Sequence, residues 1–176
     1  MRKVSFFAAF PTGLCSLCFF LIFGCGYGFG PQGEHFDQRI RLIYVEPFGN
    51  RTAQAEVEND LRTAFIDQLT RNSRFKTVAS AEEADALIGG NVLNLTTATL
   101  SYRNNILAAE ERMSVILEVN FRRKDGTILW SSRHVPGTTD YKLPDGADPL
   151  PVRKQALSKL ARDSAEHSLN LMMSDF

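Results

Sequence analysis

Residues 115–130 read VILEVNFRRKDGTILW. Apolar residues alternate with other residues along the first half of this stretch, at Val115, Leu117, Val119 and Phe121. That period of two is typical of a strand with one buried face and one face in water. Residues 124–127 (KDGT) then predict a tight turn, since Asp-Gly tolerates the positive φ that such turns need. The chain returns in residues 128–133, so the whole stretch predicts a β-hairpin.

Three further stretches predict strands. Residues 39–46 (RIRLIYVE) carry apolar side chains on both faces, which indicates a strand near the middle of a sheet. Residues 75–78 are a short candidate, and residues 86–101 read as a long strand. Within that long strand, Gly89-Gly90 predicts either a bulge or a close approach of two backbones.

Two stretches predict amphipathic helices. Residues 53–71 repeat apolar side chains at helical spacing, and Asn50 or Thr52 is the predicted N-cap. Residues 151–173 predict the second helix, with Pro151 in its first turn. Between the last strand and this helix, residues 136–151 hold four prolines and predict an irregular connection.

The order of these elements decides the fold class. Two helices must each bury one face, and the strands are mostly joined by short turns. The sequence therefore predicts an α+β two-layer sandwich, in which two helices pack on a largely antiparallel sheet of four to five strands. Residues 39–176 form this single domain in our prediction.

The first 25 residues predict export and lipidation. Arg2 and Lys3 precede an apolar run that ends at Gly24-Cys25, the pattern of a secretory signal with a lipidated cysteine at its boundary. Residues 1–24 are the predicted lipoprotein signal peptide, and residues 25–38 a lipidated, glycine-rich tether. Two alternatives stay open: a retained membrane-spanning helix, or a signal cleaved elsewhere that leaves Cys25 as a plain thiol.

Charge and cysteine content argue against a nucleic-acid partner and against a disulfide within the domain. Removing residues 1–24 takes away only two basic residues, so the remaining chain has 18 basic and 20 acidic residues, a net charge of −2. A nucleic-acid-binding domain would be strongly basic, and we therefore predict no nucleic-acid partner. All three cysteines lie at or before Cys25, so the domain itself has none for a disulfide.

No catalytic or metal-binding pattern is present in the sequence. The three histidines are scattered and form neither H-x-x-x-H nor H-E-x-x-H, and no G-x-S-x-G surrounds a serine. We predict that the chain is not an enzyme and uses no metal or cofactor.

A compact basic cluster stands at the tip of the predicted hairpin. Arg122, Arg123 and Lys124 could meet phosphate groups, because arginine binds phosphate as a two-pronged fork. Alternatively, the three are solvated charges that protect a sheet edge from aggregation. The three are candidate binding residues for phosphate groups.

The chain resembles the lipopolysaccharide-assembly lipoproteins of the LptE family. The likeness rests on short tracts spread over the mature chain: Cys25-Gly26-Tyr27, residues 45–52 (VEPFGNRT), residues 84–90 (ADALIGG), the alternating strand with its Asp-Gly turn, and Leu129-Trp130. Other periplasmic lipoproteins share the VEPFGNRT-type tract, including activators of peptidoglycan synthases and components of curli secretion.

The resemblance implies a function without catalysis. LptE-like proteins are anchored by lipid to the outer membrane and plug the lumen of a large β-barrel, LptD, where they assist lipopolysaccharide transport and assembly. The expected partners are therefore an LptD-like barrel and lipopolysaccharide, with the domain facing the periplasm or the barrel lumen. The resemblance makes Arg122, Arg123 and Lys124 candidate lipopolysaccharide-binding residues. The alternative is a periplasmic regulatory lipoprotein that docks on a peptidoglycan synthase or a secretion complex.

Replacing the predicted anchor tests the localisation. Cys25→Ser should give an uncleaved precursor or a soluble periplasmic form, because the thiol that carries the lipid is gone. Membrane flotation and uptake of labelled palmitate are the measurements. A variant that still floats with outer membranes and takes up palmitate would contradict the prediction.

Overall fold

The computed structural model describes residue 37, residues 39–103 and residues 107–176. The predicted signal peptide and all of the predicted tether except Asp37 lie outside the described residues, and so does Cys25. The predicted turn at residues 103–105 also lies largely outside them.

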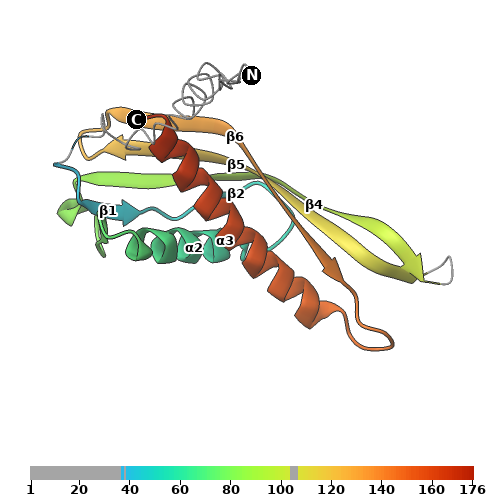
Figure 1. Ribbon diagram of the computed structural model, residues 1–176. Coiled ribbons are helices and arrows are strands. Elements are labelled where there is room, and N and C mark those ends of the chain that lie inside the picture. Colours follow the sequence, from blue (N-terminus) through green and yellow to red (C-terminus); the bar gives the residue numbers. More distant parts are fainter. Residues whose placement is uncertain (1–36, 38, 104–106) are drawn as a thin grey trace, which may run out of the picture. The chain divides into compact units, whose positions relative to one another are not determined.

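The described residues form two helices on one face of a mixed, open sheet of six strands (Figure 1). The strand order is β3-β1-β4-β5-β6, and β2 pairs with β4 beside this path. This arrangement confirms the predicted α+β fold class. The strands are β1 (Leu42–Val45), β2 (Gly49–Asn50), β3 (Lys76–Thr77), β4 (Ala86–Arg103), β5 (Leu107–Arg123) and β6 (Ile128–Lys142). The two helices are α2 (Val57–Arg71) and α3 (Leu150–Ser174), and a short 3₁₀ turn, η1 (Ala81–Glu83), precedes β4.

Antiparallel pairing dominates the sheet, as predicted, but every pairing made by β1, β2 and β3 is parallel. β4 and β5 pair from Ala86↔Arg123 to Arg103↔Leu107, and β5 pairs with β6 in the same antiparallel sense. By contrast, β1 pairs in parallel with both β3 and β4, and β2 pairs in parallel with β4. The connection through α2 permits the parallel pairing of β1 with β3, because parallel strands need a long crossover connection, usually a helix.

Two local predictions were wrong. The N-cap of α2 is Glu56, at φ 67°, and the helix begins at Val57 rather than near residue 53. Asn50 instead holds the preceding loop, since its amide donates to the Gln54 carbonyl at 2.7 Å and its side-chain oxygen accepts the Thr52 N–H at 2.8 Å.

The second error concerns the predicted irregular connection after residue 135. β6 runs on to Lys142 with Pro136 inside it, facing Ile116 of β5. Pro136 cannot donate a ladder hydrogen bond, but β6 is an edge strand, where such a donor has no partner to lose. The position of the strand at the edge is what a local reading of the sequence could not supply.

The apolar core lies between the sheet and the two helices. The predicted stripe of α2 is buried as expected: Leu61 is 1% exposed and Phe65 is fully buried. The Phe65 ring stacks on Phe48, with ring centres 5.0 Å apart. On α3, Leu160 and Met172 are fully or almost fully buried in the same core.

Glycines permit two close approaches. A Cβ at Gly90 would lie 1.8 Å from the Glu118 carbonyl oxygen of β5, which confirms the close backbone approach predicted for Gly89-Gly90. A Cβ at Gly137 would lie 2.2 Å from Ser164 Oγ, so this glycine lets α3 approach β6. A side chain at Gly90 would meet backbone atoms of β5 and push that strand away, and one at Gly137 would require at least Ser164 to shift.

A buried carboxylate joins α3 to the sheet. Glu111 of β5 is 6% exposed and accepts hydrogen bonds from the Tyr141 hydroxyl at 2.6 Å and from the Arg153 guanidinium at 2.8 and 3.1 Å. The hydrogen bonds from Arg153, above all, hold the pKa of Glu111 below its usual range, and burial raises the pKa of Tyr141. Satisfying a buried charge in this way fixes the first turn of α3 against β5 and β6.

Truncating the core ring of α2 should be costly. Phe65→Ala should lower the free energy of unfolding by about 3–5 kcal/mol, because it removes a fully buried ring and leaves a cavity. Thr63→Ala, on the exposed face of the same helix, is the matched control and should change stability little. Denaturant unfolding measures both, and an equal effect of the two substitutions would show that this face is not the core.

The Glu111 site should make stability depend on pH. Its pKa is lower in the folded chain than in the unfolded chain, so its contribution is complete above the unfolded pKa of about 4.3 and disappears as pH falls through the folded pKa. Glu111→Gln should therefore be less stable than the wild type at neutral pH, by about 1–3 kcal/mol, with a smaller difference in acid.

The exposed ion pair between Arg112 and Asp140 supplies the control. Asp140→Asn should cost less than about 1 kcal/mol, since both side chains are more than 40% exposed. Unfolding free energies of both variants at neutral and acid pH test the comparison. A Glu111→Gln penalty that does not shrink on acidification would contradict the role given to the buried charge.

Candidate functional site

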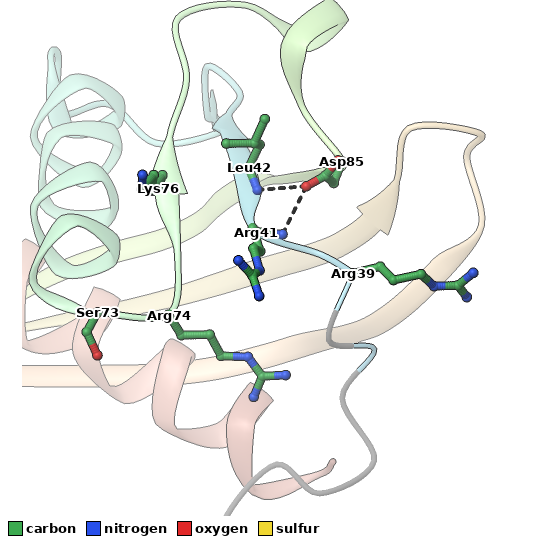
Figure 2. Close-up of a pocket in the computed structure, with 7 residues that line it drawn as sticks. All are labelled: Arg39, Arg41, Leu42, Ser73, Arg74, Lys76 and Asp85. Carbon is green, nitrogen blue, oxygen red and sulfur yellow. Dashed lines mark hydrogen bonds between the residues drawn. The ribbon is translucent and has the colours of Figure 1, made fainter.

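An open pocket of about 720 Å³ lies at the edge of the sheet where β3, β1 and β4 begin (Figure 2). Parallel pairing brings these starts together, since Leu42 lies opposite Lys76 and Ile43 opposite Ala86. Four of the lining side chains are basic, and the remaining three are Leu42, Ser73 and Asp85. We call this site the edge pocket; its basic side chains are Arg39, Arg41, Arg74 and Lys76.

The basic side chains come from the same short pattern on two neighbouring segments. Arg39-Ile40-Arg41 leads into β1, and Arg74-Phe75-Lys76 leads into β3. Ile40 and Phe75 are buried, at 4% and 3% exposure. Because successive side chains of an extended chain point to opposite sides, burying the central residue turns the flanking basic side chains outward. Parallel pairing then places the two basic pairs side by side.

Asp85 is the acidic residue of the pocket lining, and its carboxylate accepts hydrogen bonds from the backbone. Its Oδ2 accepts the N–H groups of Arg41 at 2.9 Å and Leu42 at 2.8 Å, as Figure 2 shows. These bonds fix the entry of the chain into β1. Within the described part of the chain, the Asp85 carboxylate forms no ion pair with the arginines of the pocket.

The basic side chains differ in how they are held. Arg39 forms a two-pronged ion pair with Asp37 at 3.0 and 3.1 Å, and its hydrogen bonds lower the pKa of Asp37 to about 2. The Arg74 guanidinium lies 5.7 Å from the centre of the Phe75 ring. Arg41 and Lys76 are exposed, and among the described residues neither side chain has an ion-pair partner. The edge pocket therefore presents an excess of positive charge that suits a phosphate or carboxylate group.

The structure separates the three hairpin residues that the sequence analysis grouped. Arg122 pairs with Glu46 at 2.7 Å, and Arg123 pairs with Asp37 at 2.6 Å. Lys124 Nζ donates to the backbone carbonyl of Glu82. Arg122 and Arg123 diverge because neighbouring strand residues point to opposite faces of the sheet. Each of the three therefore ties a different segment to the hairpin.

Arg122 lies in a second pocket of about 560 Å³, beyond the carboxyl end of β1. Charges in this second pocket are matched: Glu46 pairs with Arg122, and the Asn91 amide donates to Glu118 at 2.8 Å. Gly49, Gly89 and Gly90 form part of its lining. It therefore lacks the unmatched positive charge of the edge pocket.

The described residues contain no cluster of three or more histidine, cysteine, aspartate or glutamate side chains that could hold a metal ion. His134 and His167 are both exposed, on β6 and α3, and His35 lies outside the described residues. Within residues 37, 39–103 and 107–176, no helix is long and apolar enough to cross a membrane.

Comparisons with known proteins agree with this fold. The chain is similar to the solution NMR structure of uncharacterized lipoprotein B from Nitrosomonas europaea, at 16% identity and a TM-score of 0.53, over 77% of this chain and 84% of that one. It is also similar to the crystal structure of a minor lipoprotein from Acinetobacter baumannii, at 14% identity and a TM-score of 0.50, over 78% and 95% of the two chains. No curated protein matches the sequence. Residues 40–172 match the family model described as LptE, lipopolysaccharide-assembly.

Proposed function

Because the chain belongs to the LptE family of lipopolysaccharide-assembly proteins, we propose that it is a lipid-anchored outer-membrane lipoprotein that plugs an LptD-type β-barrel. In that position it assists the transport of lipopolysaccharide to the cell surface. Its domain lies in the barrel lumen or faces the periplasm, and Cys25 carries the lipid. It supports assembly without catalysing a reaction, in keeping with a non-enzymatic family.

The family match is the observation that carries the proposal. Residues 40–172 include all six strands, all of α2 and most of α3, so the likeness extends over the whole packed domain. A short shared tract such as VEPFGNRT would not distinguish this family from other periplasmic lipoproteins. A match across the whole domain favours the lipopolysaccharide-assembly function over the cell-wall alternative.

The far ends of β4 and β5 offer a surface for a barrel partner. These paired ends extend beyond α2 in Figure 1. Leu100 and Tyr102 of β4 are 43% and 62% exposed, unusual values for large apolar side chains. They lie two residues apart near the far end of β4, where the pairing with β5 shifts register. We propose that both contact the wall of the barrel.

Lipopolysaccharide contact by Arg122, Arg123 and Lys124 stays a prediction. Each residue has a partner within the domain, so a phosphate group would have to compete with Glu46, Asp37 or the Glu82 carbonyl. Lipopolysaccharide binding that is unchanged when all three are replaced by glutamine would remove these residues from the site.

Purification from native membranes tests the barrel partner. The full chain with a C-terminal tag, extracted in mild detergent, should bring with it a large outer-membrane protein whose gel mobility changes on heating, as expected of a β-barrel. Tyr102→Asp combined with Leu100→Asp should reduce the recovery of that protein, because charged groups would face an apolar contact.

Ile128→Asp is the matched control, since Ile128 is 64% exposed and follows the hairpin turn at the opposite end of the sheet. It should leave the recovery of the barrel unchanged. Recovery of a peptidoglycan synthase or a secretion complex in place of any barrel would refute the plug and favour the alternative.

A further inference from the structure

We propose that the edge pocket binds phosphate headgroups of an anionic phospholipid surface and thereby orients the anchored domain against the membrane. The inference rests on the lipid anchor of the proposed function but adds a second contact that neither the family match nor the barrel role assigns. Its physical basis is the charge of the pocket, its exposure and its place in the chain.

The positive charge of the edge pocket is local. From residue 25 onward the chain has a net charge of −2, so the domain as a whole is not drawn to an anionic surface. At the edge pocket, however, Arg41 and Lys76 are exposed and have no ion-pair partner among the described residues, Arg39 is paired with Asp37, and the Asp85 carboxylate accepts two backbone N–H groups. Attraction to anionic headgroups should therefore depend on these few side chains.

The geometry suits a surface better than a single enclosed ligand. Arg39, Arg41 and Lys76 are exposed, and the pocket opens at the edge of the sheet. Figure 2 shows Arg41 and Lys76 on the two neighbouring segments that begin β1 and β3. One guanidinium group can donate two parallel hydrogen bonds to the oxygens of a phosphate, and the Lys76 ammonium supplies a further positive charge.

The edge pocket lies close to the lipid anchor in the sequence, so even weak binding of headgroups is sufficient to orient the domain. Arg39 is 39 − 25 = 14 residues beyond Cys25, and so it lies at most about 50 Å from the anchor even with the chain fully extended. An anchored domain meets the membrane surface at an effective concentration on the order of millimolar. Headgroup binding that would be negligible in solution can then fix the orientation of the domain.

Chemical labelling of Lys76 tests this contact. The lipidated full chain is placed in nanodiscs of phosphatidylcholine alone, or of phosphatidylcholine and phosphatidylglycerol in equal parts. Acetylation of each lysine is followed by mass spectrometry, with the exposed Lys154 of α3 as the internal reference. Lys76 should be acetylated several-fold more slowly in the phosphatidylglycerol discs, and added salt should remove the difference because exposed charges are screened.

A charge-removing variant and its control locate the effect. Each basic side chain near an anionic surface contributes a factor of about five to binding, so Arg41→Gln should weaken the protection of Lys76 about fivefold. Arg51→Gln removes another exposed arginine, from the loop after β2, and should leave the protection unchanged. Equal labelling of Lys76 in the two kinds of disc, or equal loss of protection in the two variants, would overturn the proposal.

Further arms separate the sources of phosphate. Protection of Lys76 by lipopolysaccharide or by inorganic phosphate, without protection by phosphatidylglycerol, would also overturn the lipid-surface contact. If the mass of the N-terminal fragment shows no lipid on Cys25, the anchor fails. Soluble dihexanoyl phosphatidylglycerol then replaces the discs, and an unprotected Lys76 under those conditions would refute the pocket independently of the anchor.

Discussion

β4 pairs along its whole length with β5 and, on its other side, with β1 and β2. This double pairing is the constraint on which the other elements depend. It fixes one continuous face on which α2 and α3 bury their apolar stripes, and it aligns the starts of β1 and β3 beside the start of β4. The charged side chains of the edge pocket meet only because these strand starts are in register. A side chain at Gly90 would disturb this pairing, because its Cβ would lie 1.8 Å from the Glu118 carbonyl oxygen of β5.

The sequence predicted what depends on local periodicity. The alternation at residues 115–121 and the stripe through Leu61 and Phe65 predicted both the elements and their buried faces. It could not predict that β1 pairs in parallel with β3, since strand partners depend on where α2 returns the chain. For the same reason the length of β6 was missed: Pro136 is acceptable in a strand only at an edge, and edge position is a property of the whole sheet.

In the candidate site, too, the local sequence predicted less than the tertiary structure shows. The consecutive basic residues 122–124 predicted a cluster, but the alternation of the strand and three separate partners direct their side chains to different places. The residues that do converge are far apart in the chain, at 39–41 and 74–76, and each basic pair flanks a buried apolar residue. The repeated basic–apolar–basic pattern was a usable signal. Its meaning required the knowledge that the two segments lie side by side, which follows from tertiary structure.

The chain belongs to a family of lipopolysaccharide-assembly proteins, and depletion in cells tests that role. The most direct measurement is the amount of newly made lipopolysaccharide that reaches the cell surface when the chain is depleted, compared with cells in which the wild-type chain is restored. Surface lipopolysaccharide should fall on depletion while its synthesis continues, and restoration should reverse the loss. Surface lipopolysaccharide that stays at its normal level after complete depletion would contradict the claim.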